Sequence, residues 1–344
     1  MQTLVTLDNS CIIVRTDKTT ISLDPTRYIP SDLAFVSHAH TDHLSKTYKS
    51  SINRVLTSQE TMDIALARGF SIGKIHQDST VQLLNTGHIL GSRGLLVNNE
   101  LYYTGDISIR KRAFMSAEPV PNVKTLIIES TFGRPHYIFP ALSEIIHKAN
   151  EIISQMYHHG VPVLLMGYPL GKAQLLAYLF QHWEPFYTHD SVASMNLIYR
   201  KYGVPLKETL VFSEANEKGL LAKTKPWVMV CPVMHSGSTF VKFMRQKYDA
   251  VTVGFSGWAL DQRYRAAMGF DYTFPLSDHC DYSELLKVVK LSGAEKIYTF
   301  HGFAAEFANS LEKLGFKAEA LKRHPKTSRV QDGNRKVHRI DSYF

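Results

Sequence analysis

Four candidate metal-binding side chains lie within six residues of this chain, directly after a short apolar run. His38, His40, Asp42 and His43 stand in the string SHAHTDH, and residues 33–36 before them have the pattern of a strand. Neutral imidazole together with carboxylate is a typical ligand set for Zn²⁺. A histidine-rich polar turn is the alternative, but this spacing can hold two ions side by side. The motif therefore predicts a dinuclear metal site at a strand end.

The composition is that of an ordinary globular protein. The 344 residues are 44% apolar and 20% charged, with a net charge of +8 that weakly favours a polyanionic partner. The three cysteines are scattered, which argues against a disulfide framework and fits a reducing compartment. The first residues lack a signal pattern and the most apolar stretch is interrupted, so we expect a cytoplasmic protein without a membrane segment.

The predicted secondary structure changes near residue 135, from short strands to alternating helices and strands. Residues of the kinds that bind metals recur near residue 275. Before the change, short strands are predicted at residues 10–15, 19–23, 33–36, 81–85, 95–97 and 101–104, with a helix at 58–68. After it, we expect helices at 142–158, 171–182 and 282–291 and strands at 163–168, 227–231, 250–253 and 296–300. This order predicts one domain inserted into another.

Further metal-type residues follow predicted strands. His88 lies in NTGHILGS, Asp106 in YYTGDIS and His301 in YTFHGF. Each alone would usually be a turn residue, but their order after the His/Asp motif favours a shared site. We expect one ion on His38, His40 and His88, and a second on Asp42 and His43 with His301 as an extra ligand. Asp106 would bridge the two ions through its two oxygens.

The order of these motifs resembles the metallo-β-lactamase superfamily and, within it, the β-CASP nucleases. The strings ESTFGRPHYIFP, GYPLGKAQ, SGW and SDH are similar to those of the Artemis group of DNA repair nucleases and of ligase-associated DNA exonucleases. The GHILGS string and a His at position 301 also resemble RNA-processing members such as RNase J. The resemblance spans about residues 10 to 305.

This resemblance implies an α/β fold: an αββα metallo-β-lactamase sandwich with an inserted β-CASP α/β domain. The sandwich would comprise residues 1–134 and 272–330, and the insert residues 135–271. Residues 331–344 would form a C-terminal tail.

The resemblance also implies roles for residues outside the metal motif. His279 would be a general acid that protonates the leaving oxygen, and Glu129 would orient it. A structural histidine at 279, and a carboxylate at 129 that caps Thr131, are the alternatives. A phosphate would bind Lys172 at the helix start of Gly171, with Tyr168, Ser130 and Thr131 nearby. The run Arg110, Lys111, Arg112 could receive flanking phosphates.

The function implied is a two-metal phosphodiesterase that uses Zn²⁺, with Mn²⁺ as an alternative. We expect a DNA exonuclease of 5′→3′ polarity in repair, with some endonucleolytic activity on unpaired structures. An RNA nuclease on the same fold is the alternative. A small-molecule metallohydrolase or an inactive scaffold subunit is less favoured, because an insert flanked by Glu129 and His279 and a full set of ligands are both present.

The C-terminal residues form a basic segment. Residues 317–344 carry eight Lys/Arg against three Asp/Glu. Within residues 337–344, Ile340, Tyr343 and Phe344 resemble the peptide with which DNA repair enzymes bind the sliding clamp, although Val337 stands where that motif has Gln. Docking of this apolar end on its own domain is the alternative.

Overall fold

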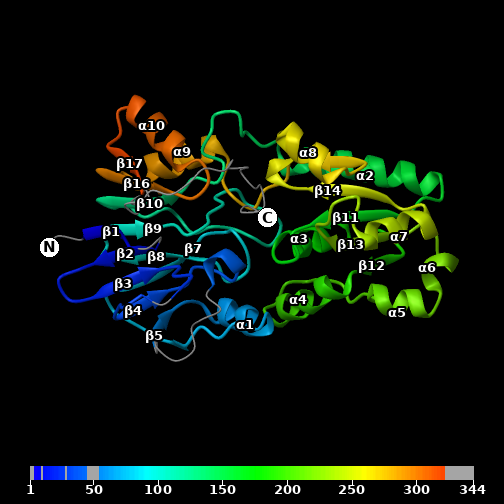
Figure 1. Cartoon of the computed structure of the whole chain (residues 1–344), viewed down its shortest axis with the longest axis horizontal. Helices are drawn as coiled ribbons and strands as arrows, with labels where there is room; N and C mark the ends of the chain where they lie inside the picture. The colour runs from blue at the N-terminus through cyan, green and yellow to red at the C-terminus, as the bar shows by residue number, and fades with distance from the viewer. Residues whose placement is uncertain (1–3, 9–10, 28, 45–53, 322–344) are drawn as a thin grey trace, which may run out of the picture.

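The fold is that of a computed structural model, which describes residues 4–8, 11–27, 29–44 and 54–321. It is a mixed α/β protein built on three sheets (Figure 1). Among the described residues, no helix combines the length and apolar character needed to span a membrane. The tail proposed to bind a clamp lies outside the described residues.

Two six-stranded sheets come from the first part of the chain and its return after residue 275. In spatial order, the first contains β1 (Leu4–Asp8), β2 (Cys11–Arg15), β3 (Thr20–Leu23), β4 (Leu33–Phe35), β5 (Arg54–Leu56) and β6 (Lys74–Ile75). The second, also in spatial order, contains β17 (Ala318–Ala320), β16 (Lys296–Phe300), β10 (Thr125–Glu129), β9 (Leu101–Tyr103), β8 (Arg93–Val97) and β7 (Val81–Asn85).

These two sheets pack face to face, with helices on their outer faces. Successive residues of a strand point to opposite faces, so Phe35 joins the core between the sheets while Ala34 and Val36 pack outward. The outward side of the first sheet carries α1 (Gln59–Ala67), and the second sheet is covered by α9 (Tyr282–Ser292) and α10 (Ala304–Lys313). The order of layers is therefore helix, sheet, sheet, helix.

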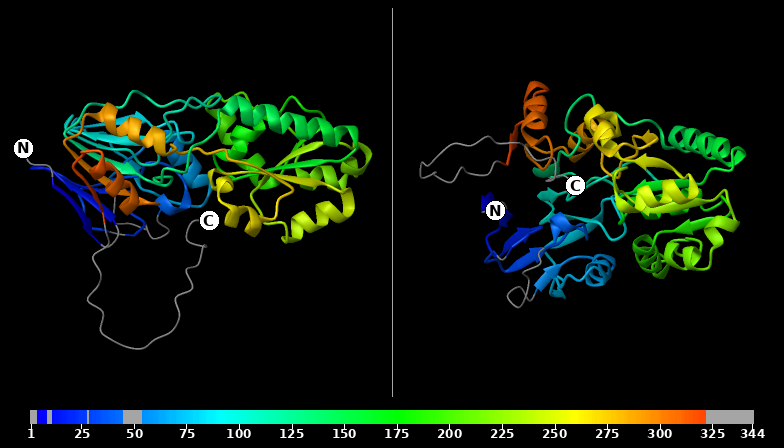
Figure 2. Two further views of the ribbon diagram at one scale, coloured as in Figure 1. Left: turned by 90° about the horizontal axis from the view of Figure 1, so that it is seen from above. Right: turned by 45° about the vertical axis from the view of Figure 1, so that its right-hand side comes forward.

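The third sheet lies beside this pair and comes from one continuous stretch of chain (Figures 1 and 2). All its strands are parallel, in the order β12 (Phe186–Thr188), β13 (Val228–Pro232), β11 (Val163–Gly167), β14 (Val251–Phe255) and β15 (Tyr272–Phe274). We call residues 142–274 the parallel-sheet unit.

Helices cover both faces of this sheet, as a buried parallel sheet requires. One face packs against α2 (Leu142–His158), α3 (Lys172–Phe180) and α4 (Asp190–Lys201). The other packs against α5 (Phe212–Glu217), α6 (Leu220–Lys223) and α7 (Thr239–Tyr248), while η2 (Gly257–Leu260) and α8 (Gln262–Met268) precede β15. The core that contains α3 and α4 continues into α1, which joins the unit to the first sheet.

Candidate active site

The candidate site residues lie just beyond the ends of strands of the two face-to-face sheets. Strands β9, β10 and β16 are parallel neighbours, so Asp106, Glu129 and His301 emerge at one edge of the second sheet. His38 and His40 follow β4 of the first sheet, His43 closes the one-turn helix η1 (Thr41–His43), and His88 follows β7. Residues far apart in sequence thus converge at one place.

The first compact group contains His38, His40, His88 and Asp106. The Nδ1 of His40 lies 3.0 Å from the Nε2 of His38 and 3.1 Å from the Nε2 of His88. The Oδ2 of Asp106 lies 3.4 Å and 3.5 Å from the same two Nε2 atoms. The structure therefore brings together the ligands expected for the first ion.

The second compact group contains His43, Asp106 and His301. The His43 Nε2 is 3.5 Å from the Asp106 Oδ2, and the His301 Nδ1 is 3.9 Å from the other Asp106 oxygen. Asp42 lies at the edge of this group, because its side chain is 72% exposed and its Oδ2 is 3.8 Å from the His43 Nε2. Asp106 belongs to both groups, as expected for a bridging carboxylate.

Two atoms of the second group are buried without a hydrogen-bond partner in the described part of the chain: the Nε2 of His43 and the Oδ1 of Asp106. Such atoms are rare in folded proteins unless an ion or water satisfies them. Burial first, and then neighbouring imidazoles, keeps the pKa of His38 and of His88 well below its ordinary value, and burial also lowers the pKa of His40. Neutral imidazole is the form that binds metal. The residues present therefore fit a pair of divalent cations.

His43 has the opposite electrostatic balance. Burial opposes its protonation, but the carboxylates of Asp106, Asp42 and Asp24 prevail and raise its pKa well above the ordinary value. Burial raises the pKa of Asp106, but His43 and then His38 and His279 outweigh it and hold this pKa well below its usual range. The centre thus attracts positive charge.

In the described part of the chain, His38, His40, His43 and His88 each have a neighbour on the ring nitrogen that points away from the other candidate ligands. The Asp24 Oδ2 accepts from the His43 Nδ1 at 2.9 Å, and the same carboxylate accepts from Tyr103 and Ser37 at 2.7 Å each. The Ser37 hydroxyl lies 2.9 Å from the His38 Nδ1. These contacts fix ring orientation and leave the inner nitrogen free for a metal.

The remaining two histidines are oriented by backbone carbonyls. The His40 Nε2 lies 3.2 Å from the Leu170 carbonyl oxygen, and the His88 Nδ1 lies 2.9 Å from the Asp278 carbonyl oxygen. The sequence reasoning missed Asp24, Ser37, Leu170 and the Asp278 carbonyl. For Asp24 the sequence holds a weak signal, because this residue directly follows β3, the neighbour of the strand that precedes the histidine motif.

The buried carboxylate of Glu129 pairs with the partly exposed His279 beside Asp106. The His279 Nδ1 lies 3.0 Å and 3.1 Å from the two Glu129 oxygens. Glu129 also accepts from the Ile107 amide at 2.8 Å and from the Thr131 hydroxyl at 2.5 Å, so it caps Thr131 as well as holding the histidine. Burial lowers the pKa of His279, but Glu129 and then Asp106 outweigh it and raise this pKa to about 9. A protonated imidazole at neutral pH can donate a proton.

The groups predicted to bind phosphate are mostly engaged with protein partners. The Lys172 ammonium donates to Asp278 and to the Leu276 carbonyl, the Gly171 amide donates to the side chain of Gln174, and the Ser130 hydroxyl donates to the Phe300 and His301 carbonyls. Tyr168 is half-buried just before Gly171. A phosphate would have to displace these partners, so the described contacts do not favour this prediction.

The basic run 110–112 is also placed differently from our expectation. Arg110 pairs with Glu284 at 2.8 Å and with Asp281 at 3.0 Å. Arg112 is buried, and its guanidinium donates to the carbonyls of Gly87, His88, Ser277 and Asp278. Only Lys111 of the three side chains is exposed. Arg112 therefore fastens two loops of the site rather than facing solvent.

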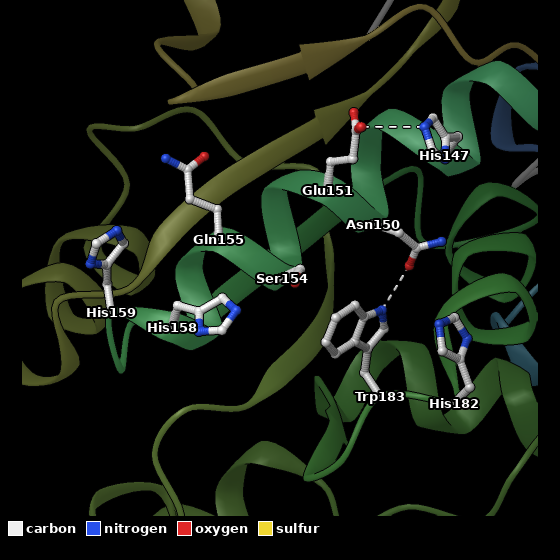
Figure 3. A pocket seen from close by; sticks show the side chains of 9 residues that line it. All are labelled: His147, Asn150, Glu151, Ser154, Gln155, His158, His159, His182 and Trp183. Atoms are coloured by element: carbon white, nitrogen blue, oxygen red, sulfur yellow. Dashed lines mark hydrogen bonds and ion pairs between the residues drawn. The ribbon is translucent and has the colours of Figure 1, made fainter.

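A groove of about 720 Å³ lies away from these residues, on the parallel-sheet unit (Figure 3). It is lined by α2 and the segment after α3, and includes the pair His147 and Glu151, whose side chains approach to 3.3 Å. Two of the lining residues are hydrogen-bonded to each other, because Trp183 donates to Asn150 at 2.8 Å. None of the predicted site residues lines this groove.

No family model matches the chain. Among curated proteins, a probable DNA ligase of Opitutus terrae is 32% identical over 86% of this chain, but the chain spans only 29% of the ligase. An RNase J-like protein of Methanocaldococcus jannaschii is 24% identical, over 79% of this chain and 74% of its own length. The 5′ exonuclease Apollo of Rattus norvegicus is 26% identical, over 74% of this chain and 48% of its own length.

A crystal structure of a protein of unknown function from Enterococcus faecalis covers 93% of this chain and 96% of its own. The TM-score is 0.59 and the identity 14%, so this likeness concerns the fold alone. The curated relatives confirm the resemblance drawn from the motifs: the chain is homologous to nucleases of the β-CASP metallo-β-lactamase type.

Proposed function

We propose that this protein is a two-metal nuclease that hydrolyses phosphodiester bonds of DNA, as a 5′→3′ exonuclease in repair with some endonucleolytic activity on unpaired structures. The observation that carries the proposal is the pair of adjoining ligand groups that share Asp106 and bury two unpartnered ligand atoms. In this proposal His38, His40 and His88 hold one ion, and His43, His301 and Asp42 hold the other. The ions are Zn²⁺, with Mn²⁺ as the alternative.

Two such ions would supply Lewis-acid stabilisation of charge on the scissile phosphate. The chain itself supplies the proton. His279, held protonated by Glu129, donates to the leaving oxygen, and its Nδ1 lies 4.0 Å from the Oδ2 of Asp106, the carboxylate that would hold both ions. Asp24, Ser37 and the Leu170 and Asp278 carbonyls keep the ligand rings in place.

The relatives support nucleic acid as the substrate class. The matched region of the Opitutus protein belongs to a probable DNA ligase, and Apollo is a 5′ exonuclease, which together favour DNA. RNA is the second candidate, because the RNase J-like protein is matched over most of its length. A net charge of +8 suits either polymer.

Matched, end-labelled single-stranded DNA and RNA, each with a 5′-phosphate or a 5′-hydroxyl, would test this function with the metal-loaded protein. Processive loss of nucleotides from the 5′ end of DNA is the expected result. Faster digestion of RNA would move the assignment to RNA processing or decay, and inertness toward both polymers would reject it. Lys172→Ala in the same assay tests the predicted phosphate pocket, since loss of a 5′-phosphate preference would support it.

We further assign the layered sheets to the αββα metallo-β-lactamase sandwich, expected at residues 1–134 and 272–330, and the parallel-sheet unit to the β-CASP insert, expected at residues 135–271. Because β15 pairs with β14, the proposed insert extends to residue 274. The order of layers and the order of the motifs support this assignment. Docking of residues 337–344 on a sliding clamp stays a prediction from the sequence.

A further inference from the structure

The segment that starts α3 touches the first ligand group from the side of the parallel-sheet unit. Its Leu170 carbonyl meets the His40 ring, as described above. Gly171 comes next, with φ of +88°, and a Cβ there would overlap the Ile89 side chain, next to His88. Glycine thus permits a close approach of this segment to the metal loops.

Lys172, the next residue, is 1% exposed and reaches across to the loop that follows β15. Its ammonium lies 2.5 Å from the Asp278 Oδ1 and 2.8 Å from the Leu276 carbonyl oxygen. These two contacts bracket Ser277 and fix the path of residues 276–278. A buried lysine is costly unless it is paired and hydrogen-bonded, so this arrangement is specific.

The fixed loop in turn orients a metal ligand. The backbone carbonyl of Asp278 accepts from the His88 Nδ1 at 2.9 Å, which leaves the Nε2 facing His40 and Asp106. Arg112 holds the same loop from the other side, with 3.2 Å between its guanidinium and the Ser277 carbonyl. Lys172 is thus connected to His88 through Asp278. It also lies two residues after Leu170, whose carbonyl contacts His40.

We propose that Lys172 is a positioning residue that joins the parallel-sheet unit to the first ligand group, so that the affinity of one of the two ions depends on the Lys172–Asp278 pair. The second group is oriented differently, because Asp24, from the first sheet, holds His43. This inference rests on the proposed metal centre and deepens it. The contact of the parallel-sheet unit with the loop at residues 276–278 sets the occupancy of the site formed by the first ligand group and not of the site formed by the second.

The chain offers a matched control. Lys201 on α4 pairs with Asp63 on α1, also at 2.5 Å, and so also joins the parallel-sheet unit to the first-sheet side. That pair is not among the contacts of the metal groups. Lys201→Met therefore removes a Lys–Asp link of the same kind without loosening residues 276–278.

The test is titration of metal-free protein with Co²⁺, followed by its visible absorption bands and by calorimetry. The wild type should bind about two equivalents. Lys172→Met and Asp278→Asn should each weaken one equivalent by about 10- to 100-fold, as is typical for contacts that orient a ligand, and leave the other unchanged. The double variant Lys172→Met/Asp278→Asn removes both charges of the pair and so leaves neither of them buried without its partner. Its metal affinities can therefore be measured even if a single variant folds poorly.

Lys201→Met should keep both affinities and both absorption bands. Wild-type affinity for both ions in the double variant would overturn the inference, as would an equal loss of both ions in all variants including Lys201→Met. A wild type that binds no Co²⁺ would instead refute the metal centre of the proposed function. No nucleic acid enters the experiment, so the substrate assignment is not involved.

Discussion

At the scale of single residues, Asp106 belongs to every compact group of candidate ligands in the described chain, including one with Glu129 and His279. Removing its carboxylate should therefore affect both ions. We expect Asp106→Ala to lower the metal content from about two equivalents to below one and to abolish cleavage. Elemental analysis of the purified protein measures the first effect. Asp42→Ala, at the exposed edge of the second group, should cost less, and equal losses for the two variants would contradict a bridging role for Asp106.

His279 should matter for catalysis more than for binding. His279→Ala is expected to lower kcat by about 10²- to 10⁴-fold, the usual contribution of a general acid, while the Kd for single-stranded DNA stays close to that of the wild type. Single-turnover cleavage together with fluorescence anisotropy separates the two. Cleavage at the wild-type rate would make His279 a structural residue.

Glu129 sets the protonation of this histidine, and the sign of its effect on pH dependence follows from the pKa. A general acid works below its pKa, so activity should fall as pH rises through about 9. Glu129→Gln removes the carboxylate that raises this pKa, and the alkaline fall should then begin at lower pH. Profiles of kcat/KM against pH measure the displacement. The metal content should stay at about two, and an unmoved alkaline limb would show that Glu129 acts otherwise.

At the scale of elements, the turn after β16 is closely packed against the segment that follows β10. His301 has φ of +57° and Gly302 φ of +50°, and a Cβ at Gly302 would overlap the Thr131 Cα and the Ser130 carbonyl. Gly302→Ala should lower the free energy of unfolding by about 1–3 kcal/mol from backbone strain, with more from the overlap.

Gly315 provides the comparison for this change. It has φ of +88°, but no atom of the described residues lies within 4 Å of where its Cβ would be, so Gly315→Ala carries the strain without the overlap. Urea denaturation of both variants should find Gly302→Ala the less stable. Equal stability would mean that the loop shifts to accommodate the methyl group.

Elements with strong local patterns were predictable from the sequence. Helix α2 and strands β7 and β16 begin and end where the periodicity placed them. Helices α5 and α6 were not foreseen, because six and four residues are too few to display a helical period. Helix α10 was also missed, because the expected elements ended at His301 and the residues from 317 onward were considered only as a basic segment.

The candidate ligands were predictable because their residue types are rare in such spacing, whereas the groups that orient them were not. A backbone carbonyl such as that of Leu170 or Asp278 has no sequence signature. Lys172 follows a glycine at a helix start, which on sequence favours a phosphate site. Its actual partner, Asp278, lies 106 residues away in the chain, and only the tertiary fold, in which β11 and β15 belong to one sheet, brings the charges together.

At the scale of the whole molecule, Asp63 links α1 to the end of α4. It accepts from Lys201 at 2.5 Å, from Tyr202 at 2.7 Å and from Gln59 at 2.8 Å, and the first two lower its pKa from 3.8 to about 2. A depressed carboxyl pKa contributes stability that is present above 3.8 and is lost as pH falls through about 2.

Asp63→Asn should therefore be slightly less stable than the wild type at neutral pH, and the difference should vanish near pH 2. Because Lys201 is largely exposed, we expect a small effect. Thermal melting of both proteins across this pH range measures it. A difference that persists undiminished at the acid end would show that packing, and not charge, is responsible.

The pairing of β10 with β16 also dictates when the site can form. Thr125 pairs with Lys296 and Glu129 with Phe300, while the whole parallel-sheet unit lies between them in the chain. Among the described residues, each strand of that unit pairs only with strands of the same unit, so the unit can fold as soon as it leaves the ribosome. The metal groups cannot be complete before β16 is made, because His301 and the loop with Asp278 and His279 are synthesised after the parallel-sheet unit. During synthesis, a nascent chain therefore lacks a complete set of candidate ligands until residue 301 has been made, and pulse-labelled hydrogen exchange should find β11 protected before β16.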